Sequence, residues 1–205
     1  MNLDYFKLNV SQNVGQISKK KLSLLKEILS AEYPEVQRLD NGGYIFLNLN
    51  EKSNFLILPN QVSANFDKIP ETFDFNSDVK KPLLQIFEAL IFEEEVKASA
   101  RFNFLKDTSN SFEKSLDLID NEKKKRKLNE KGIIGTGYRF LREGQFGGIS
   151  EIKIEPLIDD KSKWFIESII NINNDTNINA VLRYINEEIN SFESEYDDLI
   201  DLYTN

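Results

Sequence analysis

The chain has 205 residues, a net charge of −8 and no cysteine or histidine, and 40% of its residues are hydrophobic, including 15 Phe. This content is sufficient for a folded core in one domain or two small ones. The missing side chains exclude Ser-His-Asp hydrolysis, disulfides, and thiolate or imidazole metal sites, and no motif points to a cofactor. The acidic balance disfavours general nucleic-acid binding, and no apolar run approaches the ~20 residues of a membrane span, so we expect a cytoplasmic protein without membrane contact.

Residues 1–93 form the first predicted half, which reads as strand, helix, four short strands and helix. Residues 5–10 alternate as a strand, and Ser18 is placed to cap a helix that ends near Ala31. Runs rich in β-branched and aromatic residues, separated by turn residues, then predict an antiparallel meander with strands at 36–39, 44–49, 54–58 and 62–66. Apolar residues at helical spacing predict a helix from Val79 to Phe92, with Pro82 in its first turn.

Residues 94–205 form the second predicted half. Apolar residues from Val96 to Phe104 alternate with polar ones, namely Lys97, Ser99, Arg101 and Asn103. This pattern is typical of a strand with one buried face. A helix from Ser111 to Leu118 should run into a basic segment, and further strands are predicted at 138–141, 149–158 and 164–172, with a glycine-rich turn at 144–148 between the first two.

The most regular pattern is the C-terminal one, from Asn177 to Tyr203. Its apolar residues are spaced alternately four and three positions apart, at Ile178, Leu182, Ile185, Ile189, Phe192, Tyr196, Leu199 and Tyr203. This spacing predicts one helix about 40 Å long, capped by Thr176 or Asn177, with a stripe approaching a coiled-coil seam. We expect its first part to pack on the protein's own sheet, and its acidic last third to meet a partner through Phe192, Tyr196, Leu199 and Tyr203.

The order of elements is the same in both halves. We therefore predict an α+β fold of two β-α-β-meander-α halves, related by internal duplication, with antiparallel sheets covered by long amphipathic helices. The halves should form one compact unit. The sequence leaves open whether they share one sheet.

Several short runs carry a resemblance to a known group of proteins. They are Tyr33-Pro34-Glu35-Val36, Tyr44-Ile45-Phe46-Leu47, Phe55-Leu56-Ile57-Leu58, Val62 to Phe66 and Ile154-Glu155-Pro156-Leu157. In this order they resemble a sporadically distributed family of uncharacterised bacterial proteins. The resemblance implies a fold and no particular activity.

One candidate for catalysis is the pair Glu151 and Lys153 on a predicted strand. The E-x-K pattern occurs in metal-dependent nucleases, where the carboxylate holds Mg²⁺ and the lysine orients the attacking water. The same pattern recurs at Glu95 and Lys97, and such a site needs a second acidic residue that does not stand out in the sequence. The alternative is that both side chains lie on the solvated side of a strand.

Two further segments are candidate contact sites. The basic run Lys123, Lys124, Lys125, Arg126 and Lys127, with Lys131, is the only segment where a nucleic acid or an acidic surface would be expected to dock. It lacks interleaved aromatic residues for base stacking, so a solvated helix end is the alternative. Phe146, in the turn at 144–148, would be presented to a partner if this loop tip is exposed.

We therefore predict a non-catalytic protein-interaction module, such as an inhibitor, an immunity protein or an accessory subunit of a larger bacterial system. The expected partner is a protein, and self-association through the end of the last helix is the alternative. Nucleic acid would bind only through residues 123–131. The alternative function is a carboxylate- and Mg²⁺-dependent nuclease or phosphoryl-transfer enzyme centred on Glu151 and Lys153.

Overall fold

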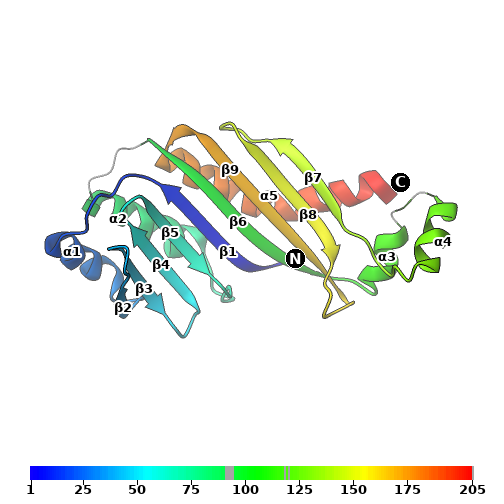
Figure 1. The fold of residues 1–205 in the computed structure, drawn as a ribbon, viewed down its shortest axis with the longest axis horizontal. Coiled ribbons are helices and arrows are strands. Elements are labelled where there is room, and N and C mark those ends of the chain that lie inside the picture. Colours follow the sequence, from blue (N-terminus) through cyan, green and yellow to red (C-terminus); the bar gives the residue numbers. More distant parts are fainter. Residues whose placement is uncertain (91–94, 118, 120, 205) are drawn as a thin grey trace.

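The computed structural model describes residues 1–90, 95–117, 119 and 121–204, and it describes side chains as far as Leu199, except that of Glu193. Its described part is an α+β fold with one open, nine-stranded, fully antiparallel sheet and six helices (Figure 1). The two predicted halves thus share one sheet. The predicted boundary between them, at residues 93 and 94, lies outside the described residues.

The elements of the first half follow the predicted order. They are β1 (Asn2–Ser11), α1 (Lys19–Leu29), β2 (Glu35–Arg38), β3 (Tyr44–Asn48), β4 (Ser53–Leu58), β5 (Gln61–Phe66), the π-helix η1 (Asn76–Lys80) and α2 (Lys81–Leu90). Ser18 caps α1 as predicted, because its hydroxyl accepts a hydrogen bond from the backbone N–H of Lys21 at 3.3 Å. The predicted end of the second helix, Phe92, lies outside the described residues.

The second half differs from the prediction mainly in its helical insertion. Its elements are β6 (Glu95–Asp107), α3 (Ser111–Asp117), α4 (Glu122–Glu130), β7 (Tyr138–Glu143), β8 (Ile149–Pro156), β9 (Lys163–Asn177) and α5 (Ile178–Thr204). The single helix expected from Ser111 is two short helices, and α4 begins at its own cap, where Asn121 Oδ1 accepts from the N–H of Lys124 at 3.0 Å. Leu118, the predicted end of that helix, is outside the described residues.

The strand order is nearly symmetric about the middle of the sheet. It runs β2-β3-β4-β5-β1-β6-β9-β8-β7, so β1 and β6 pair at the centre, and the last strand of each half follows on its outer side. Neighbouring strands in a sheet lie about 4.8 Å apart, so nine of them extend over roughly 40 Å. The single sheet answers the question that the sequence left open, because both halves contribute strands to it.

Helices α2 and α5 lie behind the sheet in Figure 1. The inward side chains of the strands, among them Phe6, Phe55 and Phe102, are fully buried in one core with the apolar stripes of these helices. In α5, the predicted stripe from Ile178 to Leu199 is buried or half-buried, which confirms that this helix packs on the protein's own sheet. No helix in the described part of the chain is both long and apolar enough to span a membrane.

Candidate functional site

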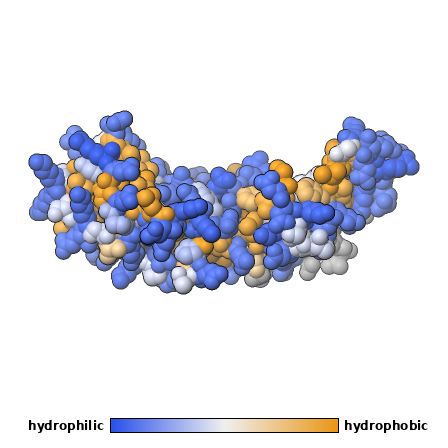
Figure 2. Space-filling view, turned by 90° about the horizontal axis from the view of Figure 1, so that it is seen from below, coloured by the Kyte–Doolittle hydropathy of each residue, from blue (hydrophilic) through white to orange (hydrophobic). Residues whose placement is uncertain are grey.

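The other face of the sheet, opposite α2 and α5, is called the open face here. No described helix lies over its middle (Figure 1). Figure 2 shows the molecule from the side with this face upward, and its two ends rise above the middle. The open face is therefore the floor of a broad hollow.

The floor at β1 and β5 is lined by side-chain amides and hydroxyls that hydrogen-bond to one another. Asn9 Oδ1 accepts from the hydroxyl of Ser63 at 2.8 Å and from Gln61 Nε2 at 3.1 Å, and Asn9 Nδ2 donates to the hydroxyl of Ser99 on β6 at 3.4 Å. These bonds hold the side chains flat against the strands, so this part of the floor is polar and already ordered.

Two basic residues face each other on the central strand pair. Lys7 of β1 and Arg101 of β6 are direct cross-strand neighbours, and Lys97 lies on the same side of β6 beyond them. These three residues are called the central basic patch. Apart from these three residues, the outward positions from Tyr5 to Ser11, from Gln61 to Asn65 and from Lys97 to Asn103 are neutral, and the acidic Glu95 precedes Lys97 on the same side of β6. The patch is thus positive in a chain whose net charge is −8.

Beside the patch, an ion-pair network crosses β6, β9, β8 and β7. Glu167 of β9 is almost fully buried, and its carboxylate pairs with Arg101 and, at 2.8 Å, with Lys153 Nζ. Lys153 also lies 3.3 Å from Glu151, which accepts a hydrogen bond from Arg139 at 2.6 Å. Three cations surround two carboxylates, so the network carries a net charge of +1.

The network keeps both Glu151 and Lys153 in their charged forms, because it shifts the pKa of each group. Burial raises the pKa of the Glu151 carboxyl, but hydrogen bonds from Arg139 and Lys153 outweigh this and leave the pKa below its usual range. Hydrogen bonds to Glu167 and Glu151 raise the pKa of the Lys153 ammonium. The second carboxylate that the sequence did not reveal is Glu167, but a lysine lies between the two acids where a nuclease would hold Mg²⁺. No group of three or more acidic residues in the described chain is placed to hold a metal ion.

The end of α5 does not present the predicted aromatic surface. Phe192 is buried and stacks on Phe104 with ring centres 4.7 Å apart, and Tyr196 is buried with Lys106 Nζ 4.6 Å from its ring centre. Both side chains therefore lie inside the protein, which corrects the expectation that they meet a partner. Leu199 is half-buried against the same core, and the side chain of Tyr203 is outside the described ones.

Basic residues far away in the sequence compensate the acidic residues of α5. Arg142 of β7 pairs with both Glu188 and Glu195, and Lys106 of β6 pairs with Asp197. Both cations come from the strands that α5 covers. The acidic pattern of this helix is thus partly an internal feature, as well as a property of the surface.

The two candidate contact sites outside the sheet, Phe146 and the basic run, lie apart from the centre of the open face. Phe146 is half-buried and packs edge-on against Tyr184 of α5, with ring centres 5.5 Å apart, so it is not a free loop tip. The basic run forms most of α4, which has no buried residue and lies at one end of the molecule (Figure 1). Within it, Lys125 pairs with Asp117 and Glu122, and Arg126 pairs with Glu130.

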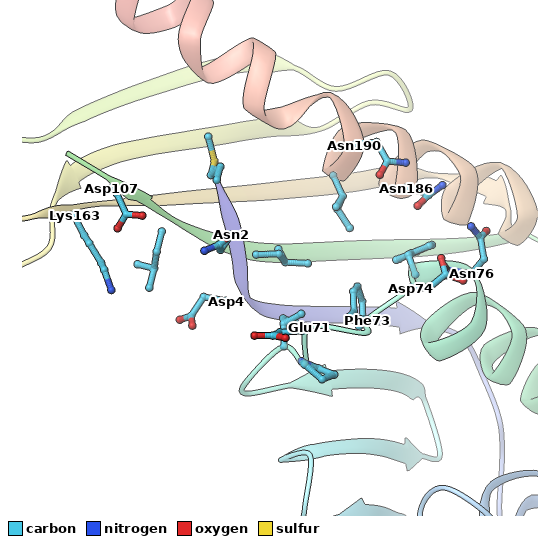
Figure 3. A pocket seen from close by; sticks show the side chains of 17 residues that line it. Asn2, Asp4, Glu71, Phe73, Asp74, Asn76, Asp107, Lys163, Asn186 and Asn190 are labelled. Carbon is cyan, nitrogen blue, oxygen red and sulfur yellow. Dashed lines mark hydrogen bonds between the residues drawn. The ribbon is translucent and has the colours of Figure 1, made fainter.

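A pocket of about 830 Å³ opens between the start of β1, the segment before α2, and α5 (Figure 3). Its charged side chains are Asp4, Glu71, Asp74, Asp107 and Lys163, and four asparagines also line it. Asp74 is engaged at the start of η1, where backbone N–H groups of Asn76 and Ser77 donate to its carboxylate and hold its pKa low. The other carboxylates are exposed, so this pocket is acidic and open to solvent.

The comparisons with known proteins add no further constraint. No protein-family model matches the chain, and the comparison with curated proteins gives no match.

Proposed function

We propose that this chain is a non-catalytic protein-interaction module that binds its partner on the open face of the sheet. The observation that carries the proposal is the hollow itself, which combines a polar, hydrogen-bonded floor with a middle that no described helix covers. A protein interface needs about 800 Å² on each partner, and a patch of roughly 40 by 25 Å on this face would provide it. The partner's class remains the predicted one, a component that the chain inhibits, protects against or assists within a larger bacterial system.

The edges of the sheet are less suited to a partner than its face. Edge strand β2 has only four residues and follows Pro34, and the other edge strand, β7, carries Arg139, Arg142 and Glu143. Short and charged edges discourage the addition of another strand. The symmetric strand order also supports the inference that the two halves arose by duplication, which would give the module a face built from two similar parts.

The alternative function, a Mg²⁺-dependent enzyme, has weaker support. Its two carboxylates, Glu151 and Glu167, are both neutralised by neighbouring cations. A divalent cation would have to displace Lys153 from between them, at the cost of two ion pairs. We therefore keep the interaction module as the proposed function.

The test is affinity capture from the native host with three forms of the protein. Ser99→Trp places a bulky neutral side chain in the middle of the open face, and Ser23→Trp, at an exposed position of α1, is the matched control. We expect the wild type and Ser23→Trp to recover the same partner and Ser99→Trp to lose it. Equal recovery by all three forms, or recovery of the protein alone as a monomer by light scattering, contradicts the proposal.

A further inference from the structure

We propose that the central basic patch selects a protein partner that presents a cluster of carboxylates to the hollow. This inference rests on the proposed function, and it specifies the chemistry of the partner. Its basis is the contact between two like charges, Lys7 and Arg101, at the centre of the sheet.

Lys7 and Arg101 are like charges placed directly opposite each other in an antiparallel pair. Like charges placed directly opposite each other destabilise an antiparallel strand pair. Two contacts of Arg101 reduce this repulsion. Arg101 pairs with Glu167, and its guanidinium carbon lies 5.8 Å from the centre of the Tyr5 ring. Lys7 forms no ion pair with a described residue, and Asp67, on the diagonal beyond the end of β5, does not reach it.

The same sheet shows how the protein neutralises such a contact elsewhere. Arg139 and Lys153 are also direct cross-strand neighbours, on β7 and β8. There, Glu151 and Glu167 supply carboxylates to both cations. Neither Lys7 nor Lys97 forms an ion pair with a described residue, although Asp67 lies on the diagonal from Lys7 and Glu95 lies two positions before Lys97 on the same side of β6. The anion missing from the central strands is therefore one that a partner can supply.

The amount of charge favours an acidic protein over a nucleic acid. Nucleic-acid interfaces are strongly basic because they neutralise many phosphates. Here Lys7 and Lys97 are the two basic residues of the patch that form no ion pair with any described residue, within a chain of net charge −8. Around them lie amides and hydroxyls, and half-buried apolar residues follow toward β3 and β4, at Ile45, Leu47, Leu56 and Leu58. A few carboxylates flanked by apolar groups on a protein surface would match this pattern.

The first test is a titration of the ¹⁵N-labelled full chain with a synthetic helical peptide rich in Glu and Leu, followed by NMR. We expect amide shifts that center on β1, β5 and β6, and an affinity that falls as NaCl is raised. Shifts confined to α4, no shifts at millimolar peptide, or stronger binding of a DNA or RNA duplex at the same face would overturn the proposal.

The second test uses two charge-matched double variants. Lys7→Glu with Lys97→Glu reverses the patch, and Lys123→Glu with Lys124→Glu makes the same change in α4, so both move the net charge from −8 to −12, because each replacement contributes −2. Arg101 is kept because it holds Glu167. We expect the patch variant to bind the peptide at least about tenfold more weakly and the α4 variant to bind like the wild type.

Capture from the host separates this proposal from the proposed function. If Ser99→Trp loses the partner and the patch variant keeps it, the proposed interaction module is supported and the proposal of an acidic partner is contradicted. If every variant keeps the partner, both proposals fail. Loss in Ser99→Trp and in the patch variant, with retention in the α4 variant, supports both.

Discussion

The two faces of the sheet use charge in opposite ways. On the covered face, Arg142 and Lys106 reach acidic side chains of α5, so that cations and carboxylates meet across the packed helix. On the open face, the two carboxylates of the network around Glu167 are likewise paired, but neither Lys7 nor Lys97 forms an ion pair with a described residue. Charges that serve the fold are thus paired within the chain, and we propose that Lys7 and Lys97 meet carboxylates of a partner instead. This difference, more than any single motif, is the reason for proposing the open face as the binding surface.

The largest loss of stability is expected from a substitution on the covered face. Phe192→Ala removes a ring that stacks on Phe104 and packs edge-on against Phe102, 5.4 Å away. We expect a loss of about 3 to 5 kcal/mol in the free energy of unfolding, measured with urea, because the cavity lies inside the core. Leu24→Ala, at an exposed position of α1, is the control and should change it little. A small loss at Phe192 together with loss of the captured partner would restore the prediction that this end of α5 is a binding surface.

A smaller effect is expected on the open face at Glu167. Glu167→Gln keeps the shape of the side chain but leaves Arg101 and Lys153 without their shared buried acid. Both cations are partly exposed to solvent, so we expect a loss of about 1 to 3 kcal/mol rather than that of a fully buried pair. Glu155→Gln, an exposed outward position of β8, should have almost no effect. Equal stability of both variants would show that the network does not support the sheet.

The contribution of Glu151 to the response to acid should be smaller again. Its pKa in the folded protein lies below the ordinary value of 4.5 for a glutamate, so the carboxylate stabilises the fold above that value, and the contribution is lost as the pH falls through the folded pKa. We expect Glu151→Gln to be less stable than the wild type at about pH 7 and the difference to shrink toward about pH 3. Urea unfolding across this range measures it. A difference that grows on acidification would contradict the direction of this pKa shift.

Local patterns in the sequence predicted most of the elements. Alternation from Val96 to Phe104 placed Lys97 and Arg101 on the polar side of a strand, and the spacing of α5 predicted its buried stripe. These patterns work because side-chain direction follows the strand and helix periods. The same periodicity could not show that Phe192 packs on β6, since an apolar stripe looks alike whether it meets a sheet or a partner.

The candidate site depends on pairings that the sequence does not display. Lys7 and Arg101 are 94 positions apart in the chain, and they meet only because β1 and β6 pair at the centre of the sheet. Glu167 gave no signal of its own, because a single acid in a strand is usually solvent-facing, and its burial depends on Arg101 and Lys153. The acidic end of α5 is a related case, because Arg142 and Lys106 come from distant strands and pair with three of its carboxylates.

The smallest expected effect is also the one that most sharply separates stability from binding. Lys7→Glu turns the like-charge contact with Arg101 into an opposite-charge pair, so we expect the free energy of unfolding to rise by about 0.2 to 1 kcal/mol at low salt, with Asp67 on the diagonal reducing the gain. Lys97→Glu is the control, because its cross-strand neighbour is Ser11 and no gain is expected. Both single variants should bind the acidic peptide more weakly than the wild type, and only Lys7→Glu should stabilise the fold. If Lys7→Glu is instead neutral or destabilising, the contact between Lys7 and Arg101 has no cost in the free chain, and the case for a missing anion at the centre of the open face is lost.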